Sequence, residues 1–576
     1  MAQGSQFAFI VHAASRISLV QIFCWLRCLM GSMLDEDTLL AGQTGAVEES
    51  FLIRTLRDIL NKHVLGKDVL SDKAIDDIGE DSLDALADLD TRMESLWDLC
   101  ADPRTAEFLI RCCRAAMVLS EAAARGLALA AKLAAEGRES ADVAAPTRAS
   151  EVCLGCLANI TTHKDVVLQM DESDVRGLAQ LALDGLSSSE GTVVLQCLRL
   201  ICALMMGPGY RSSSVLWQHS AIPRYIYVLE NSLLVEVVQH AADALNQALV
   251  LDAAADGHAT SSSGGPPRDC GEQLVALMAS EGLGGILAQR IREVASGLAG
   301  EDPTLSGDGD PETALHSALC LGQSFLVELL ELRQERASGG ILQLEDLLAL
   351  FTSAFRVLDS VGRPEVVDAT LELLSSLLDW EAVERASKLN TGEGALVVPP
   401  AADATALRPQ AAAFLAGTLG TGIVEKLIFF LQDKVRDAES LAEDKLRAFP
   451  DVEKEAKAKT AREGESQEEN AQHAENDEEK EKTEDEQEDE SSVEVALLLL
   501  DLAPWAKVRE HSEALEPLLA DLLSGRFGKA LRQAASSVSP KFLRRLNLPI
   551  PTRIAASGME EGHRARSRSR SRSRSR

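Results

Sequence analysis

A helical phrase recurs every 44 residues in the middle of this 576-residue chain. Its three copies keep apolar residues in the same two columns: Leu154, Leu198 and Ala242 in one, and Leu157, Ile201 and Leu245 in the other. Apolar residues that return after three or four positions form one face of an amphipathic helix. A helical unit with a fixed period must stack on its neighbours, because one unit alone cannot bury its apolar face. The phrase therefore predicts a helical-repeat protein, which offers a binding surface rather than an active-site pocket.

Composition agrees with an all-α fold. Aromatic residues make up only 4% of the chain, and Ala and Leu, which favour helix, dominate it. Alternating runs of β-branched or aromatic residues with polar ones are nearly absent, so there is little indication of strands. A period of roughly 40–47 residues is typical of HEAT and armadillo repeats. We predict an all-α, armadillo/HEAT-like α-α superhelix with disordered inserts and tails.

Charge and hydropathy restrict the partners. The formal net charge of −33 argues against non-specific binding of nucleic acid by the folded body. No uninterrupted apolar run reaches the about 18–20 residues of a membrane-spanning helix, so a membrane partner is not expected. Eleven cysteines, an odd number, indicate reduced thiols in an intracellular protein.

Catalytic and metal-binding motifs are missing from the sequence. Cys153 and Cys156 form a CxxC pair without a second pair, and the helical repeat explains both as core thiols. The histidines show no ligand spacing, and no serine has the context of a nucleophile elbow. We therefore expect no catalytic residues, no metal site, no cofactor and no small-molecule substrate, and we classify the chain as non-enzymatic.

Changes in composition divide the chain into segments. Helical patterns begin at 47–64 and include an Ala-rich segment at 104–136. Nearer the C-terminus lies an acidic block, which contains eleven acids between Glu475 and Glu490. The predicted segments are an extension at 1–46, disordered or targeting; the first part of the array at 47–252; a flexible insertion at 253–270; the second part of the array at 271–436; an acidic low-complexity insert at 437–490; C-terminal helices at 491–538; and a basic tail at 539–576.

The first 33 residues leave several interpretations open. They contain two apolar stretches and basic residues, and no acid precedes Asp35. This pattern fits a disordered extension, a start codon assigned too early with Met33 as the true start, or a targeting segment. An organelle-targeted or membrane-associated helical protein that uses residues 1–33 is therefore one alternative function.

Several runs of residues resemble one known family. These runs are Leu89-Asp90, Met93-Glu94, Leu96-Trp97-Asp98-Leu99, Glu151 to Ile160, Leu195 to Leu204 with Leu216-Trp217, and Ser492 to Ser524 with Pro504-Trp505. In this order they resemble the serum amyloid A-like protein family, which is distinct from the serum apolipoprotein, mainly over 83–251. The resemblance implies an armadillo-type fold, a nuclear and non-enzymatic protein, and a link to cell proliferation.

The 44-residue register also aligns a polar face. In armadillo repeats the third helix lines a concave groove, and here positions spaced i, i+3, i+7 share one helical face. The candidate partner-binding residues on this face are Asn159, Gln196, Arg199, His240, Asp243 and Gln247. An asparagine suits a peptide backbone because its amide both donates and accepts hydrogen bonds. However, Gly155 stands where a tryptophan is usual and Ala203 where the asparagine would recur, so a solvated helix face is the alternative interpretation.

The chain ends in alternating arginine and serine. The candidate phosphorylation sites are Ser567, Ser569, Ser571, Ser573 and Ser575. Each phosphoserine adds about −1.5 to −2 charges, so modification would invert the charge of the tail. Such tails resemble the RS domains of splicing-associated proteins, which RS-directed kinases and import receptors recognise, and unmodified arginines can contact RNA phosphates. A tail without a specific reader, or one that pairs with the acids of 475–490, is the alternative.

These observations predict a non-enzymatic helical-repeat scaffold or adaptor. It should bind protein segments in a concave groove, and its expected location is nuclear, with a cytoplasmic pool left open. The first alternative is an RNA-processing-associated factor that acts through its Arg/Ser tail, and the second is the organelle-targeted or membrane-associated protein named above.

Overall fold

A computed structural model gives the fold of the chain. It describes residues 46–64, 80–138, 140–207, 210–259, 270–298, 306–307, 309–336, 344–361, 363–390, 411–412, 415–416, 420–448, 484–524, 539–546 and 548. The N-terminal segment 1–45 and the Arg/Ser tail lie outside these residues. The predictions made for these two segments are therefore untested.

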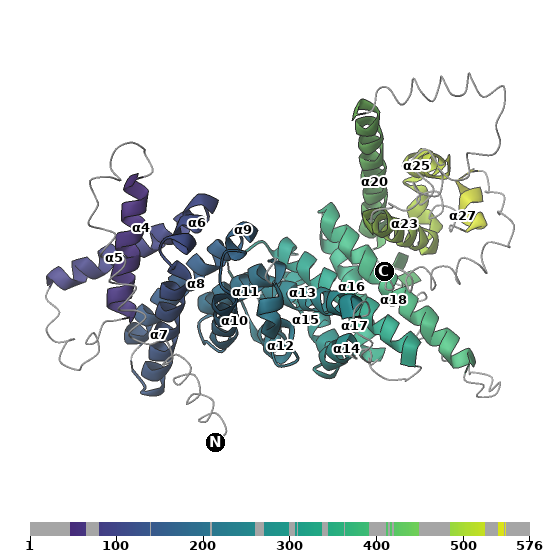
Figure 1. Cartoon of the computed structure of the whole chain (residues 1–576). Helices are drawn as coiled ribbons and strands as arrows, with labels where there is room; N and C mark the ends of the chain where they lie inside the picture. Colours follow the sequence, from purple (N-terminus) through teal and green to yellow (C-terminus); the bar gives the residue numbers. More distant parts are fainter. Residues whose placement is uncertain are drawn as a thin grey trace, which may run out of the picture. The chain divides into compact units, whose positions relative to one another are not determined.

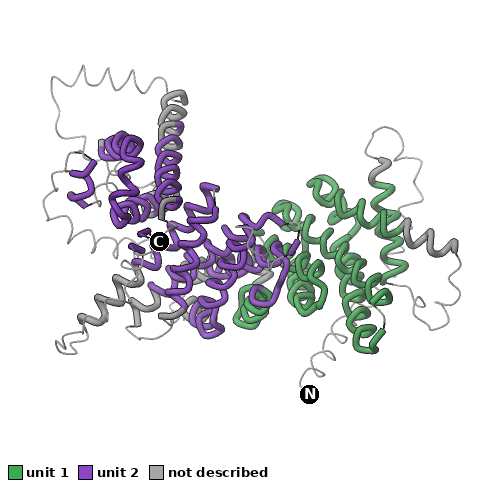
Figure 2. Tube along the Cα trace, turned by 180° about the vertical axis from the view of Figure 1, so that it is seen from behind, with its two compact units in different colours: residues 1–228 green, residues 229–576 purple. Residues whose placement is uncertain are grey.

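Contacts divide the chain into two compact units, Met1–Val228 and Leu229–Arg576 (Figure 2). The division falls within helix α12 (Ile222–Asn231) and not at the insertion expected at 253–270. In both units, the described residues form helices and turns without a strand, apart from one isolated parallel bridge between Leu234 and Ser306. The all-α prediction is confirmed.

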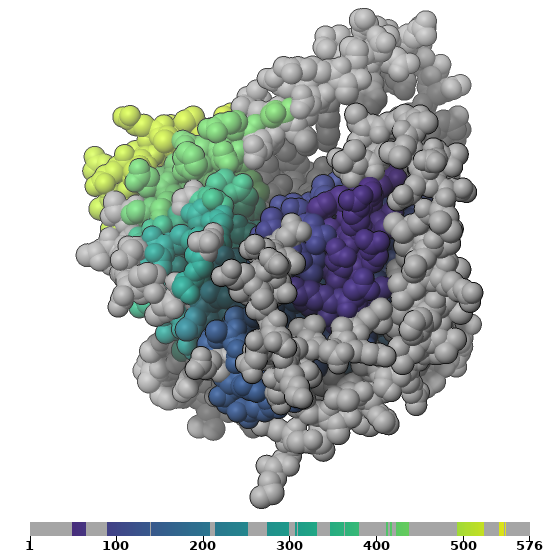
Figure 3. Space-filling model, turned by 90° about the vertical axis from the view of Figure 1, so that its left-hand side faces the viewer, coloured from purple at the N-terminus to yellow at the C-terminus, as the bar shows by residue number. Residues whose placement is uncertain are grey.

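Unit 1 is a succession of helices that pack on their neighbours. Their bounds are α4 (Ala46–Ile59), the π-helical turn η3 (Leu60–Val64), α5 (Glu80–Leu99), α6 (Pro103–Arg111), α7 (Ala115–Ala135), α8 (Ser140–Thr161), α9 (Lys164–Val167), α10 (Glu172–Gly185), α11 (Gly191–Met206), the 3-10 helix η4 (Tyr210–Trp217), and most of α12. Figure 3 views a face on which the N-terminal helices of this unit, in purple, lie at the surface.

Three helices make one repeat in unit 1. A short helix, a longer second helix and a long third helix follow one another as α6, α7 and α8, and again as α9, α10 and α11. The third helix α8 packs against α5, α7 and α11 (Figure 1). Leu154, Leu157, Leu198 and Ile201 are all fully buried, which confirms the register of the first two copies of the phrase.

Small residues let these helices approach closely. A Cβ added at Gly126 of α7 would lie 2.1 Å from Ser150 Oγ of α8, and one added at Gly185 of α10 would lie 2.3 Å from Cys197 Sγ of α11. Ser150 uses this proximity, because its hydroxyl donates to Ala123 O across the helix pair at 3.1 Å. Glycine at these positions therefore sets the spacing between helices, since any larger side chain would force them apart.

The segment expected to be helical over 104–136 is two helices. Asp102 caps α6 by accepting a hydrogen bond from Thr105 N at 2.9 Å, and α6 ends at Arg111. Arg114 then adopts a left-handed conformation with φ of 49°, and α7 begins at Ala115. No glycine or proline marks the break, so the sequence pattern could not reveal it.

Unit 2 continues the repeat with longer helices. Their bounds are the end of α12, α13 (Val235–Ala259), α14 (Cys270–Ser280), α15 (Leu283–Leu298), α16 (Pro311–Arg336), α17 (Leu344–Ser360), α18 (Pro364–Asn390), α20 (Gly420–Ala448), α23 (Glu484–Leu502), α24 (Trp505–Arg509), α25 (Ser512–Ser524) and α27 (Pro540–Arg545). In succession α13 packs on α16, α16 on α18 and α18 on α23. Ala242 and Leu245 are fully buried, so the third copy of the phrase also lies in a core.

Some helices extend beyond the predicted boundaries. α13 continues to Ala259, into the expected flexible insertion, and α20 continues to Ala448, into the expected acidic insert. α27 lies within the expected basic tail, where Phe542 and Leu543 are buried. Composition alone placed these boundaries too early, because charged or small residues can continue a helix whose apolar face is already packed.

One helix of unit 2 could cross a membrane by length and composition. Residues Pro311–Leu330 of α16 have a mean hydropathy of 1.3, and the bent pair α14–α15 passes the same test only if it is taken as one span. However, 61% of the α16 window is buried within the protein, where the helix packs against α13, α15 and α18. Its apolar character is therefore explained as that of a core helix in a helical repeat.

Candidate functional site

The predicted polar face divides between the two units. Asn159, Gln196 and Arg199 lie on α8 and α11 of unit 1, whereas His240, Asp243 and Gln247 lie on α13 of unit 2.

In unit 1 the three predicted residues form one hydrogen-bond network. Arg199 donates to Asn159 Oδ1 at 2.9 Å and to Gln196 Oε1 at 2.7 Å. Asn159 in turn donates from Nδ2 to Trp97 O at 3.0 Å. Gln196 is buried, while Asn159, Arg199 and Trp97 are half-buried. We call Trp97, Asn159, Gln196 and Arg199 the polar seam.

Asn159 stabilises the end of a neighbouring helix. Trp97 lies in the last turn of α5, where carbonyl groups lack a helical partner. The N–H of Ala101 bonds to Asp98 O, so it leaves the carbonyl of Trp97 to the amide of Asn159. The asparagine that the sequence suggested for holding a partner's backbone therefore already holds a carbonyl of its own chain.

A tryptophan missing from α8 is supplied by α5. A Cβ added at Gly155 would lie 2.4 Å from Cε2 of Trp97, so the indole occupies the space that a side chain at Gly155 would fill. The 44-residue register includes Gly155 but not Trp97, so the sequence alone did not place Trp97 on this face. Gly155 is itself the sequence signal for this contact, because a glycine on a helix face permits a bulky side chain of another helix to approach.

Ion pairs lie beside the polar seam on the same two helices. Arg148 of α8 pairs with Glu94 of α5 at 2.7 Å and with Glu151 of α8 at 2.9 Å. Burial lowers the pKa of Arg199, but a guanidinium remains charged in proteins. The face therefore combines an acidic cluster, formed by Glu94, Arg148 and Glu151, with the separate positive charge of Arg199.

In unit 2 the second group lies on α13, next to α16. His240 Nδ1 is 3.7 Å from Asp243 Oδ2, and Ser317 of α16 donates a hydrogen bond to Asp243. Burial raises the pKa of Asp243, and Ser317, His240 and His316 oppose the rise. Gln247 Oε1 is buried without a hydrogen-bond partner in the part of the chain that the structure describes. These contacts place Asp243 at the contact between α13 and α16.

The CxxC thiols lie in the core of unit 1. Cys153 and Cys156 are both fully buried, and burial raises the pKa of Cys153 to about 12. A thiol with so high a pKa stays protonated at neutral pH, as expected for a cysteine that packs in a core. Within the described ranges, no group of three His, Cys, Asp or Glu side chains could hold a metal ion. The candidate phosphoserines from Ser567 to Ser575 lie outside the described residues.

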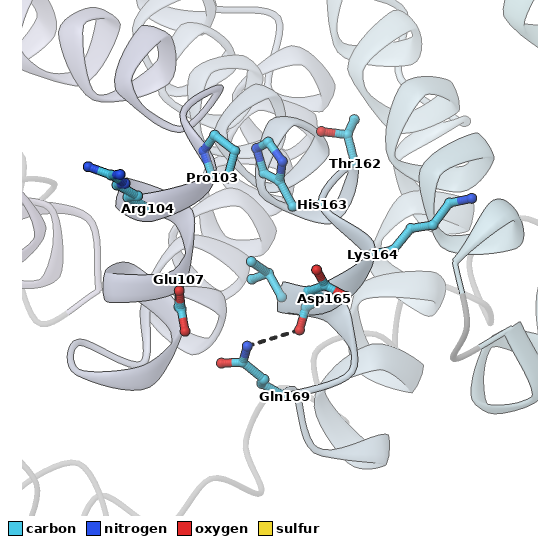
Figure 4. A pocket seen from close by; sticks show the side chains of 9 residues that line it. Pro103, Arg104, Glu107, Thr162, His163, Lys164, Asp165 and Gln169 are labelled. Carbon is cyan, nitrogen blue, oxygen red and sulfur yellow. Dashed lines mark hydrogen bonds between the residues drawn. The ribbon is translucent and has the colours of Figure 1, made fainter.

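An open pocket of about 520 Å³ lies elsewhere in unit 1, where the turns before α6 and α9 meet (Figure 4). Arg104 and Lys164 extend in opposite directions there, and Gln169 donates to Asp165 O at 3.0 Å. His163 Nε2 is buried without a hydrogen-bond partner among the described residues. The lining carries both signs of charge and includes none of the residues predicted from sequence, so it does not suggest a particular ligand.

No family model matches the chain, and no curated protein matches it. Among solved structures, a designed armadillo repeat protein is similar at 13% sequence identity and a TM-score of 0.29, over 57% of this chain and 99% of that one. Another similar structure is an engineered protein, with 15% identity and a TM-score of 0.27, over 51% of this chain and 92% of that one. The helix packing described above is what identifies the fold as an all-α helical repeat.

Proposed function

We propose that this chain is a non-enzymatic helical-repeat scaffold that binds an extended protein segment along the polar seam of unit 1. The observation that carries the proposal is the hydrogen-bonded series from Trp97 through Asn159 to Arg199. These side chains come from α5, α8 and α11, which pack one on the next. They remain half-buried, whereas the apolar residues of the repeat around them are fully buried.

The seam has the properties of a binding surface. The backbone beneath it is rigid, because α5, α8 and α11 pack on one another through buried residues. Its indole offers a large amphipathic surface, and tryptophan and arginine are the residue types that most often dominate binding energy at interfaces. Both groups are held by contacts within the protein, so little side-chain entropy is left to lose when a partner binds.

A phage-displayed library of random linear peptides tests this proposal on the full chain. Peptides that bind the wild type should bind Trp97→Ala at least about tenfold more weakly, as expected for an interface anchor. Tyr227→Ala, which removes an exposed aromatic side chain from α12, is the matched control and should bind as the wild type does.

Hydrogen exchange of the complex locates the site. Bound peptide should slow amide exchange at the ends of α5 and α8 and in α11. Equal binding to wild type and Trp97→Ala, with protection only on other helices, would reject the polar seam as the binding surface.

We also propose that the protein acts in the nucleus, within the serum amyloid A-like family and its link to cell proliferation. Support comes from the sequence resemblance over 83–251 and from the Arg/Ser tail. Imaging of a tagged chain with and without residues 564–576 tests the location, and a cytoplasmic full-length chain would contradict it.

The Arg/Ser tail supports a second candidate function in RNA processing. Seven arginines from Arg564 onward alternate largely with serines, and such a tail binds phosphates through its positive charge. Filter binding of a single-stranded RNA should be lost on deletion of 564–576 and retained in Trp97→Ala. RNA binding that survives the deletion would place this activity elsewhere in the chain.

A further inference from the structure

Arg199 differs from the other half-buried or buried arginines of the two units. Arg290, whose side chain is 5% exposed, pairs with Glu293 at 2.6 Å, and Arg92 pairs with Asp58 at 2.7 Å. Arg148, which is exposed, also contacts two glutamates. In the described part of the chain, Arg199 has no carboxylate partner, and both of its hydrogen bonds go to neutral amide oxygens.

Among the described residues, no opposite charge compensates the positive charge of Arg199. Amide oxygens satisfy part of the hydrogen-bonding capacity of a guanidinium but do not neutralise its charge. Removing a charge from water is unfavourable unless an opposite charge approaches it. Burial is accordingly the one cause that shifts the pKa of Arg199, and it lowers that pKa.

The two amides also fix the geometry of Arg199. Its terminal nitrogens donate separately, one to Gln196 and the other to Asn159. This arrangement holds the plane of the guanidinium and leaves most of its N–H donors unused. A carboxylate is the group that matches a planar fork of such donors, through two parallel hydrogen bonds.

We propose that Arg199 is a carboxylate-binding subsite of the polar seam, and that the segment it binds carries an acidic side chain, Asp or Glu. This inference rests on the proposed function, because it specifies the chemistry of the bound segment. Trp97 supplies the apolar surface next to Asn159, and Arg199 supplies the charge on the other side of that residue.

The neighbouring charges favour a protein partner over a nucleic acid. Arg148 lies between Glu94 and Glu151, so this cluster carries more acid than base. It shares α5 and α8 with the polar seam, and Glu151 precedes Asn159 by about two helical turns on α8. A phosphate backbone running along these helices would meet that acidic cluster, whereas a single carboxylate needs only Arg199.

Fluorescence anisotropy with four labelled probes tests the inference on the full chain. The probes are a pool of mixed Leu, Ser and Glu peptides, the same pool with Gln in place of Glu, the same pool with Lys, and a single-stranded oligouridine. All peptides are amidated at the C-terminus, so only side-chain carboxylates differ. The Arg/Ser tail also attracts acidic peptides, and the decisive comparison is therefore between variants that all retain the tail.

Arg199→Gln should bind the Glu pool about 10- to 100-fold more weakly than the wild type, as expected for lost hydrogen bonds to a charged group. The affinity of Arg199→Lys for the Glu pool should lie between those of the wild type and Arg199→Gln, since lysine keeps the charge without the planar fork. Arg176→Gln removes an equal charge from the exposed face of α10 and should bind as the wild type does. Hydrogen exchange of the free variants checks that unit 1 remains folded.

The possible results separate the two proposals. If the Glu and Gln pools bind equally, with no effect of Arg199→Gln but a loss in Trp97→Ala, the carboxylate subsite is refuted and segment binding stands. If no peptide pool depends on Trp97 or Arg199, both proposals fail. Oligouridine binding that disappears in Arg199→Gln would show that the subsite serves nucleic acid and would overturn the inference.

Discussion

Gly155 shows how a single residue can hide a site from sequence analysis. Asn159 and Arg199, which the 44-residue register assigned to one polar face, are half-buried on two stacked helices, α8 and α11. The register could not show that the missing tryptophan arrives from α5, since Trp97 and Gly155 are far apart along the chain. Asn159 was read as a free amide for the same reason: its partner, Trp97 O, belongs to another helix.

Gly155→Ala tests the contact with the indole. The new Cβ would lie 2.4 Å from Trp97 Cε2, so the helices must separate or the ring must move. We expect the free energy of unfolding to fall by about 1–3 kcal/mol, as for an overpacked core. Gly177→Ala on α10 is the control, because nothing lies within 4 Å of its added Cβ. The free energy of unfolding of Gly177→Ala should rise by about 0.5–1 kcal/mol, because alanine replaces a glycine inside a helix. Urea midpoints measure both, and equal shifts would disprove the close contact.

His63 should make the stability of unit 1 depend on pH. Burial, followed by the charge of Lys62, lowers its pKa from 6.5 to about 4. Between these values the unfolded state binds a proton and the folded state does not, so stability falls as the pH falls. The shift corresponds to a loss of about 3 kcal/mol, which is largely reached at about pH 4 and complete below it.

Urea unfolding between pH 7 and about pH 4 measures this loss. His63→Gln should remove the part of the pH dependence due to His63, whereas His219→Gln, which removes an exposed imidazole, should keep it. The assignment fails if His63→Gln and the wild type lose stability in parallel over this range.

Helices were predictable from sequence where their apolar periodicity is long and uninterrupted. α8 and α11 match the repeated phrase, since an amphipathic stripe is sufficient to specify a helix that packs on one side. The break between α6 and α7 was missed because alanine-rich sequence favours helix on both sides of it. There the fold imposes a turn at Arg114, a residue type with no preference for a left-handed conformation.

Substitutions at Arg114 test this strained turn. Asparagine tolerates the left-handed region, whereas β-branched valine does not. Both remove the arginine charge that acts on Asp174, so a comparison of the two cancels that charge effect. Arg114→Val should be less stable than Arg114→Asn by about 1–2 kcal/mol in urea unfolding. If the two variants are equally stable, the chain does not need a left-handed residue between α6 and α7.

The whole molecule follows the logic of a repeat array, in which helices pack on others of the same repeat and of the adjoining repeat. Unit 1 stacks α5, α8 and α11, and unit 2 stacks α13, α16 and α18. Stability in such arrays is the sum of local terms and contacts between neighbours. The period reveals this architecture directly, but the division at Val228 depends on long-range contacts that no local pattern encodes.

Equivalent core substitutions in the two units should therefore have local effects. Leu157 and Leu245 occupy the same column of the repeat, and both are fully buried. Replacing either with alanine should cost about 2–5 kcal/mol, because it removes buried methyl groups and leaves a cavity. Leu157→Ala should speed hydrogen exchange first in α5, α8 and α11, and Leu245→Ala in α13 and α16, since destabilisation spreads from a repeat to its neighbours. Equal loss of protection throughout both units in either variant would show that the chain unfolds as one cooperative body, and would contradict an array held together by contacts between neighbouring helices.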